Sequence, residues 1–320
     1  MSNLIEVKDL KVHYPIRSGI LNRVTDHVRA VDGVNLAFEE GKTYGLVGES
    51  GSGKSTIGKA IIGLETITDG QIFYNGEDVS KQARQRRSDY RQNVQMVFQD
   101  AMSSFNPKRR IIDIMSEPLR NFTNLTPAEE KKRAIELLEI VGLTEEALYK
   151  YPHQFSGGQR QRIGVARAVA LNPKLVIADE PVSALDLSVQ AQVLNFMKQI
   201  QDEYNISYLF ISHDLGVVKH MCDEIAIMYR GRFAEYGNKQ DIYQNAQHIY
   251  TKRLLSAIPE VNPNKREENK RRRQEIAAAY DESSLKYFDN NGRVHDLQSL
   301  SNTHSVAVSD INDVNKEGEL

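Results

Sequence analysis

The most distinctive chemistry in the sequence lies in a glycine-rich loop, Gly48-Glu49-Ser50-Gly51-Ser52-Gly53-Lys54-Ser55-Thr56. Its pattern, Gly-x-x-x-x-Gly-Lys-Ser, stands between a short apolar run and a helical pattern, as a phosphate loop requires. Glycines let successive N–H groups converge on phosphate oxygens, and the following helix adds the partial positive charge of its N-terminus. Lys54 would reach the β- and γ-phosphates, and Ser55 would place its hydroxyl on Mg²⁺. The sequence therefore predicts a nucleotide site formed by Gly48, Ser50, Gly51, Gly53, Lys54, Ser55 and Thr56.

Two adjacent carboxylates, Asp179 and Glu180, follow the apolar run Leu175-Val176-Ile177-Ala178. In open parallel sheets, ligands gather beyond the carboxyl ends of the strands, so this position suits a nucleotide site. Asp179 is predicted to join the Mg²⁺ shell, and Glu180 to orient an attacking water or accept its proton beside the γ-phosphate. Two acids also occur where a buried strand simply passes into a loop, so the pair alone does not establish catalysis.

A second serine and glycine cluster, Ser156-Gly157-Gly158-Gln159, precedes another helical pattern, Ile163 to Leu171. It predicts a second helix N-terminus that can accept an anion. We call this helix N-terminus, Ser156 to Gln159, the second cradle. Because the chain already has one phosphate loop, the second cradle predicts a contact with a second nucleotide.

The elements that must position these residues are those of an α/β fold. Thr43–Val47 is a short, β-rich run that leads directly into the phosphate loop. The apolar runs Leu175–Asp179 and Tyr208–Ser212 bracket a helical pattern over residues 188–203, as expected for buried parallel strands joined by a crossover helix. Alternating apolar and polar residues over Ile5–Val12 predict an N-terminal strand with one buried face.

The pattern along the chain predicts one nucleotide-binding domain and an extension. Residues 1–262 form the domain, with a helical insert at about residues 100–170, in which Thr126 and Pro127 mark a capped helix start. Residues 263–320 are charged and lack sustained periodicity beyond a helix expected across the charge block and Ile276–Ala279. We therefore expect a weakly ordered extension, and we assign it no function. A nucleic-acid-binding arm at its basic block, Lys265 to Arg273, is the alternative.

Composition excludes several classes of protein. The 320 residues include 41 basic and 43 acidic side chains, and a net charge of −2 argues against nucleic acid as the main partner. The single cysteine, Cys222, cannot form an internal disulfide or a cysteine-rich metal site. No run approaches the 18 apolar residues of a membrane helix, and the start lacks the pattern of a signal peptide, so we expect a cytosolic chain that reaches a membrane through a partner.

The segment Phe155-Ser156-Gly157-Gly158-Gln159-Arg160-Gln161-Arg162 resembles the signature motif of ATP-binding cassette (ABC) proteins. Gln99 resembles the family's Q-loop glutamine, which touches Mg²⁺ or water and couples to the membrane partner. Asp186 matches the D-loop, and His213 matches the switch histidine that contacts the γ-phosphate. Tyr14 stands where family members place an aromatic ring on adenine, although an aromatic at a strand end also packs at the rim of a core.

This resemblance implies ATP and Mg²⁺ as ligands of an ABC-type ATPase core, a mixed sheet with flanking helices. It also implies an N-terminal antiparallel β subdomain and a helical insert. In the family, two subunits sandwich two ATP molecules, so Ser156, Gly158, Gln159 and Asp186 would contribute to nucleotide contacts across the pair. The metal shell would include Ser55, Gln99 and Asp179. The residues implied in catalysis are Glu180, His213, Lys54 and Gln99.

The resemblance narrows to the oligopeptide, dipeptide and nickel importer branch, and is strongest for the F-type ATPase subunits of oligopeptide importers. It rests on Tyr151–Phe155, Asp179–Asp186, His213–Val218 and Gln247–Pro259, and covers residues 3–262. It implies a peripheral ATPase on the cytoplasmic side of the cell membrane. Its partners would be a homologous ATP-binding subunit in a heterodimer, two transmembrane permease subunits and an extracellular peptide-binding lipoprotein.

Two departures and two alternatives qualify this interpretation. Ile249 replaces the usual proline, and the cysteines that bind an iron–sulfur centre in some relatives are absent, so no such cluster is predicted. Dipeptides, nickel or sugars are alternative cargoes, because the ATPase need not touch the cargo. A soluble ABC ATPase acting on DNA or ribosomes would use the same site, but here only a short helical segment separates Gln99 from Ser156 and there is one set of motifs.

Overall fold

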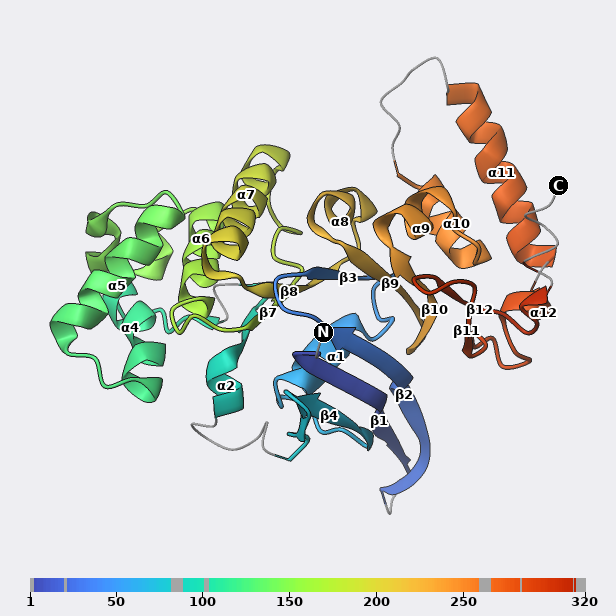
Figure 1. The fold of residues 1–320 in the computed structure, drawn as a ribbon, viewed down its shortest axis with the longest axis horizontal. Coiled ribbons are helices and arrows are strands. Elements are labelled where there is room, and N and C mark those ends of the chain that lie inside the picture. Colours follow the sequence, from blue (N-terminus) through green and yellow to red (C-terminus); the bar gives the residue numbers. More distant parts are fainter. Residues whose placement is uncertain are drawn as a thin grey trace.

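The computed structural model describes residues 3–19, 22–81, 89–100, 104–258, 266–282, 284–312 and 314. The predicted domain boundary at residue 262 lies outside these residues. Two sheets, with helices around them, make up the described chain (Figure 1). The larger sheet has eight strands in the order β11-β12-β10-β9-β3-β8-β7-β6. Their bounds are β3 Thr43–Val47, β6 Val94–Val97, β7 Leu175–Asp179, β8 Ser207–Ser212, β9 Glu224–Tyr229, β10 Arg232–Asn238, β11 Leu297–Ser299 and β12 Ser305–Ala307.

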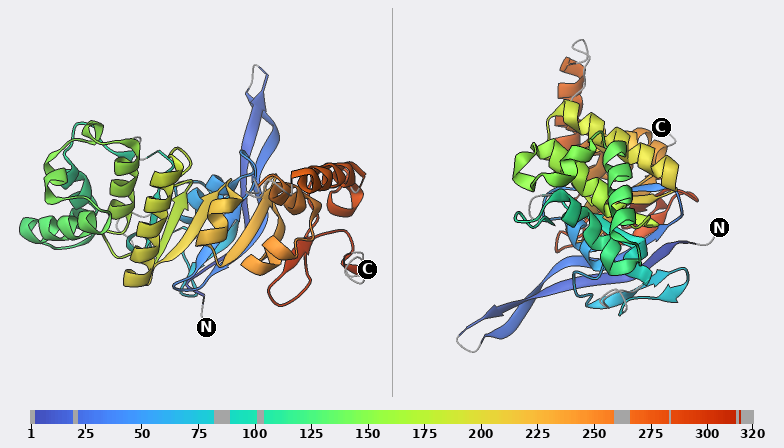
Figure 2. Two further views of the ribbon diagram at one scale, coloured as in Figure 1. Left: turned by 90° about the horizontal axis from the view of Figure 1, so that it is seen from above. Right: turned by 90° about the vertical axis from the view of Figure 1, so that its left-hand side faces the viewer.

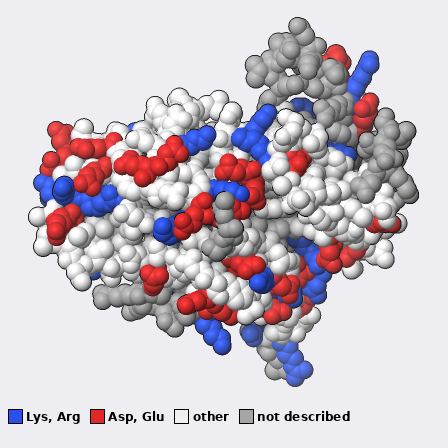
Figure 3. Space-filling model, viewed as in Figure 1, with Lys and Arg blue, Asp and Glu red and all other residues white. Residues whose placement is uncertain are grey.

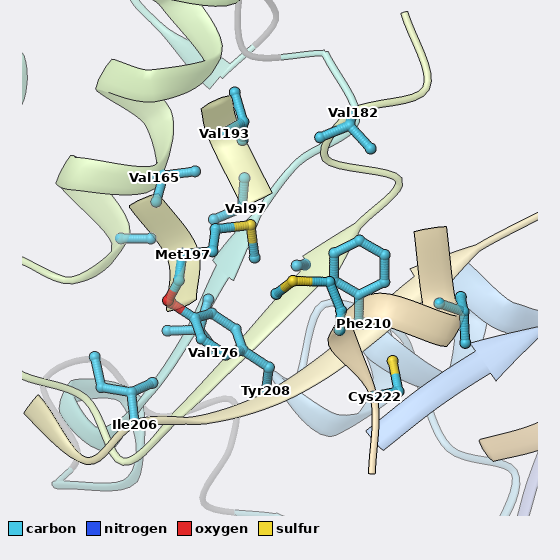
Figure 4. Packing of buried hydrophobic residues seen from close by; sticks show 14 of the residues in the cluster. Val97, Val165, Val176, Val182, Val193, Met197, Ile206, Tyr208, Phe210 and Cys222 are labelled. Atoms are coloured by element: carbon cyan, nitrogen blue, oxygen red, sulfur yellow. The ribbon is translucent and has the colours of Figure 1, made fainter. Parts of the chain in front are cut away.

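The centre of this sheet is parallel and fully buried. Strands β6, β7, β8, β3 and β9 pair in parallel, and every residue of β3, β7 and β8 is buried. On β8, Tyr208 and Phe210 face one core, while Leu209 and Ile211 face the other. This is why the runs read as continuously apolar in the sequence. The crossover helix α7 (Leu187–Tyr204) packs on the first of these faces, as Figure 4 shows.

The smaller sheet is antiparallel, in the order β2-β1-β4-β5. Its strands are β1 Ile5–Ser18, β2 Arg23–Phe38, β4 Asp69–Tyr74 and β5 Glu77–Asp78. The first strand is longer than the alternating run at Ile5–Val12 predicts, because residues 13–18 also pair with β2. The extra length forms a hairpin that projects from the rest of the molecule (Figure 2).

Helix α1 (Lys54–Ile61) lies between the two sheets. Ile57 and Ile61 are fully buried in a core that also holds Val7 of β1, Leu46 of β3 and Ile211 of β8. The smaller sheet therefore covers the helix that follows the phosphate loop and fixes its position over the larger sheet.

The predicted helical insert is present, at the left of Figure 1. Its capped helix start is confirmed, because Thr126 and Glu129 form a reciprocal capping box with Pro127 in the first turn. Within the described residues, no helix has the length and apolar character needed to cross a membrane. The remaining helices are α2 Asp89–Asn93, α4 Ile111–Phe122, α5 Pro127–Ile140, η2 Glu145–Tyr149, η3 Pro152–Gln154, α6 Gly157–Ala168, α8 Leu215–Met221, α9 Lys239–Gln244, α10 Ile249–Ser256, α11 Arg266–Glu282 and α12 Ser284–Tyr287.

The expectation of a weakly ordered C-terminal extension is wrong for residues 284–308. Strands β11 and β12 form a hairpin that joins the edge strand β10 and extends the larger sheet. Phe288, Val294 and Val306 are buried in the main core. Their apolar side chains are too widely and irregularly spaced to give a period of 2 or 3.6, so the pattern of the segment alone did not reveal them.

Candidate active site

The phosphate loop leaves the carboxyl end of β3 and ends at α1, and its glycines are required by close backbone contacts. A Cβ atom at Gly48 would lie 2.2 Å from the Met228 carbonyl oxygen. Gly53 has a φ of +107°, and a Cβ there would lie 2.0 Å from the Ala30 carbonyl oxygen. Among the described residues, no side chain caps the N-terminus of α1. Its first amides thus face the loop, where an anion is favoured.

Lys54 is the first residue of α1 and is buried beneath the loop. Its Nζ donates to the carbonyl oxygens of Gly48 and Glu49, both at 2.9 Å. Burial lowers the pKa of this ammonium, against the opposing effect of the nearby Glu180 and Asp179 carboxylates. The lysine is thus held at the loop by weak neutral acceptors, which a phosphate can replace with charged ones.

Ser55 and Asp179, predicted as metal ligands, are brought together. The Ser55 Oγ donates to the Asp179 Oδ1 at 2.7 Å. Burial raises the pKa of the Asp179 carboxyl, and the Ser55 hydrogen bond opposes this. Within the described chain, no cluster of three or more His, Cys, Asp or Glu could hold a metal by itself. One hydroxyl and one carboxylate fit Mg²⁺, which usually completes its shell with waters and substrate phosphates.

Two other predicted site residues, Gln99 and His213, contact the same carboxylate oxygen of Glu180. The Gln99 Nε2 donates to Glu180 Oε2 at 3.0 Å, and the His213 Nδ1 lies 3.3 Å from the same oxygen. Glu180 has a φ of +47°, and its backbone N–H donates to the Ile211 carbonyl oxygen at 2.9 Å. Such a conformation costs a non-glycine residue roughly 1 kcal/mol or more, and is found where the surrounding structure fixes it.

Tyr14 lies on β1, opposite Val28 of β2. Its side chain lies within hydrogen-bonding reach of Glu65 and of Thr56 in the first turn of α1. Burial, together with Glu65, raises the pKa of the Tyr14 hydroxyl. The tyrosine is therefore adjacent to the phosphate loop, with 39% of its surface exposed.

The second cradle is built at the N-terminus of α6. Ser156 and Gln159 form a reciprocal capping box, in which Ser156 Oγ accepts from the Gln159 amide at 3.3 Å. Gly158 allows close packing on α7, because a Cβ atom there would lie 2.3 Å from Val189 Cγ1. Asp186 caps α7, and its hydrogen bonds from Ser188 and the Val189 amide lower the pKa of its carboxyl.

The structure does not bring this cradle to the phosphate loop of the same chain. In the part of the chain described, no hydrogen bond or ion pair links Ser156, Gly158, Gln159 or Asp186 to residues 48–56. Helix α6 contributes to the core on one face of the larger sheet, whereas α1 belongs to the core on the other face.

Two further residues lie near the loop, in a segment, Gln247–Pro259, for which the sequence predicts only a family-like tail. The Tyr250 hydroxyl accepts from the Glu49 amide at 3.1 Å, and the Arg253 Nη2 lies 2.9 Å from Glu49 Oε1. No local pattern could have identified them, because the hydrogen bond joins residues 201 positions apart.

Comparison of the sequence with known proteins identifies the family of this chain. The family model for ABC transporters matches residues 31–183, and the model for the oligopeptide/dipeptide transporter C-terminal region matches residues 234–288. The oligopeptide transport ATP-binding protein OppF of Lactococcus lactis subsp. lactis (strain IL1403) is 58% identical over 308 residues, which cover 96% of this chain and 97% of that protein. The chain belongs to the ATP-binding subunits of ABC transporters. Its activity is ATP hydrolysis coupled to transport.

Other ABC relatives agree with the assignment. The dipeptide transport ATP-binding protein DppF of Escherichia coli (strain K12) is 48% identical, over 83% of this chain and 79% of its own. The match with OppF includes most of the C-terminal segment, so the family resemblance continues beyond residue 262, where the sequence analysis ended it.

Solved structures confirm the predicted ABC ATPase fold. The ATP-binding cassette MJ0796, solved as a dimer in a post-hydrolysis state with ADP and Pi, has a TM-score of 0.64 and 26% identity, covering 73% of this chain and 98% of its own. CbiO1 of Clostridium perfringens, from the cbiONQ transporter complex, has a TM-score of 0.66 at 24% identity, over 79% and 96% of the two chains.

Proposed function

We propose that this ABC ATPase powers the import of oligopeptides, from the cytoplasmic side of the cell membrane. The observation that carries the catalytic part is the convergence of Gln99 and His213 on the Glu180 carboxylate, beside Lys54 and the Ser55–Asp179 pair. The OppF protein of Lactococcus lactis, named for oligopeptide transport, supports the cargo class.

The phosphate loop and the two oxygen ligands would hold ATP with Mg²⁺. Lys54 would exchange the two loop carbonyls for phosphate oxygens, and Ser55, Asp179 and Gln99 would ligate the metal directly or through water. The bound Mg²⁺ supplies charge neutralisation at the phosphates. Tyr14 would lie along the adenine, since it is adjacent to Thr56.

Glu180 would act as the base that orients the attacking water. Its carboxylate accepts from Gln99, and His213 lies against the same oxygen, so the side chain is held by residues that follow two other strands, β6 and β8. His213, more than half exposed, would contact the γ-phosphate. This arrangement would put charge where it develops in phosphoryl transfer, and its catalytic effect would come from positioning and electrostatic stabilisation.

A homologous ATP-binding subunit would complete each site. Ser156, Gly158 and Gln159 form an anion-accepting helix N-terminus remote from this chain's own loop, and Asp186 caps the neighbouring helix. They would meet the ATP of the partner, and the partner's equivalent residues would meet this chain's ATP. The dimer of the cassette MJ0796 supports such a pair, and we propose a heterodimer.

A cavity of about 270 Å³ offers a contact for the two transmembrane permease subunits. It lies between β6, α4 and α6 and is lined by Met96, Phe98, Phe105, Pro118 and Phe122, among others. A permease helix that moved in this cavity would displace Phe98. Gln99 directly follows Phe98 and would pass the displacement to the Glu180 carboxylate, to which it donates a hydrogen bond. An extracellular peptide-binding lipoprotein would deliver cargo through the complex.

A dipeptide is the second candidate cargo, favoured by the 48% identity to DppF of Escherichia coli.

We propose no nucleic acid partner, since acidic and basic side chains are interspersed on the face shown in Figure 3.

Copurification tests the transport assignment. Tagged Glu180→Gln protein is isolated with ATP from detergent-solubilised membranes, and retained proteins are identified by mass spectrometry. We expect a second ATPase, two multi-span proteins and a lipoprotein, which is then assayed for oligopeptide and dipeptide binding. Retention of ribosomal or DNA-associated proteins without any integral membrane protein would overturn the transport assignment.

A further inference from the structure

Glu49 of the phosphate loop is held by a helix far away in the sequence. Its backbone N–H donates to the Tyr250 hydroxyl at 3.1 Å, and its carboxylate pairs with Arg253 at 2.9 Å. Both partners are on α10. The carbonyl oxygen of Glu49 accepts from Lys54 Nζ at 2.9 Å. All three polar groups of one loop residue are therefore engaged, two of them by α10.

Tyr250 is itself rigidly placed. The side chain is fully buried, and its ring packs edge to face on Tyr229 with centroids 4.7 Å apart. Its backbone N–H donates to His248 Nδ1 at 3.0 Å, which caps the helix. Burial raises the pKa of the Tyr250 hydroxyl to about 12, so the group stays neutral at physiological pH.

Helix α10 is anchored to the larger sheet by a buried carboxylate. Glu235 of β10 is fully buried and accepts from the amides of Gln247 at 2.7 Å and His248 at 3.1 Å. His304, which precedes β12, lies 2.7 Å from the same carboxylate. The position of α10 is thus fixed by contacts outside the nucleotide site.

We propose that Tyr250 is a positioning residue of the nucleotide site, which holds the Glu49 amide and thereby keeps the phosphate loop in the conformation that accepts phosphates. The inference rests on the proposed phosphate site. Three glycines make the loop costly to order, and a loop ordered before binding loses less entropy when the nucleotide arrives. The exposed Arg253–Glu49 pair contributes little in water, so the buried hydroxyl carries the effect.

The test removes only the hydroxyl. Tyr250→Phe is compared with Tyr208→Phe, because Tyr208 is equally buried and its hydroxyl donates to the Met197 carbonyl oxygen, away from the loop. ATP affinity of the full chain is measured by displacement of a fluorescent nucleotide. We expect Tyr250→Phe to weaken ATP binding by about threefold to tenfold. Tyr208→Phe should bind as the unmodified chain does, even where the two variants lose similar thermal stability.

The separate effects on KM and kcat distinguish a positioning role of Tyr250 from a catalytic one. In the assembled transporter, Tyr250→Phe should raise the KM for ATP and leave kcat nearly unchanged, because the base and metal ligands are intact. Unaltered ATP affinity in Tyr250→Phe, or an equal loss in Tyr208→Phe, would overturn the inference. Lys54→Ala tests the underlying site: if it binds ATP as well as the unmodified chain, the proposed phosphate site is wrong, and the inference falls with it.

Hydrogen exchange keeps the proposal testable if Tyr250→Phe does not fold. In the unmodified full chain, residue-resolved exchange should show the Glu49 amide protected relative to the Gly51 amide in the absence of nucleotide. Exchange of the Glu49 amide as fast as that of Gly51 would contradict the hydrogen bond on which the inference depends.

Discussion

At the scale of single residues, burial determines the pH at which the His248 imidazole takes up a proton. The side chain is fully buried, its Nδ1 accepts from the Tyr250 amide, and the rings of Tyr287 and Phe288 lie against it. Burial lowers the pKa of the imidazole from 6.5 to about 3. The folded chain therefore keeps His248 neutral over a range in which the unfolded chain protonates it.

This difference predicts a pH dependence of stability. Below pH 6.5 the unfolded state binds the extra proton, so the free energy of unfolding should fall by up to about 1.4 kcal/mol per pH unit as the pH drops toward 3. His248→Asn keeps an acceptor for the Tyr250 amide and removes the titration. Urea unfolding between pH 7 and pH 4.5 should therefore give a flatter profile in His248→Asn. The exposed His27→Asn is the control, and parallel profiles for all three proteins would refute the prediction.

The residues of the phosphate loop could be predicted because their types carry the chemistry in one short segment. Asp179 and Glu180 were predicted from their place after a buried strand, whereas Gln99 and His213 were implied only by the family resemblance. The structure brings these four residues together beside Lys54. The contacts of Tyr250 and Arg253 depend on how α10 docks on the sheet, which no short pattern encodes.

At the scale of elements, the close packing of α6 against α7 depends on the absence of a side chain at Gly158. A Cβ atom at Gly158 would lie 2.3 Å from Val189 Cγ1, whereas one at Gly157 would meet its nearest neighbour at 3.9 Å. Gly158→Ala should lower the free energy of unfolding by about 1–3 kcal/mol through overpacking, and Gly157→Ala should change it little. Denaturant unfolding gives both values.

A compensating substitution sharpens this prediction. Val189→Ala removes the methyl groups that the new Cβ would meet, so Gly158→Ala with Val189→Ala should regain part of the lost stability. If Gly158→Ala unfolds at the same denaturant concentration as Gly157→Ala, the close contact is not limiting.

Element predictions succeeded where burial is two-sided or caps are present, as in β7, β8 and α5. The β1–β2 hairpin was underestimated, since its outer residues pair through the backbone while their side chains are exposed. Such pairing leaves no hydrophobic period in the sequence.

At the scale of the whole molecule, the C-terminal hairpin completes the larger sheet. It is attached through β12 to β10 and through the buried contact of His304 with Glu235. The helical insert lies at the opposite end of the molecule (Figure 1). The change in composition at residue 262 predicts a domain boundary there, yet residues on both sides share one core.

Loss of the Glu235–His304 contact should destabilise the whole chain. His304→Ala leaves the buried Glu235 carboxylate with one donor fewer, so the free energy of unfolding should fall by about 2–4 kcal/mol. In the same segment, the partly exposed His295 ring lies 3.2 Å from the Leu285 carbonyl oxygen, so His295→Ala should cost less. Equal denaturation midpoints for the two variants would mean that the buried contact does not secure the hairpin.

The measurement that tests the central claim most directly is ATP turnover by the assembled transporter carrying Glu180→Gln. The amide cannot accept a proton, so steady-state hydrolysis should fall at least about a hundredfold, while ATP affinity stays within a fewfold of the unmodified complex. The exposed Glu203→Gln serves as the control and should hydrolyse ATP normally. Undiminished turnover in Glu180→Gln would contradict the site assembled around this carboxylate.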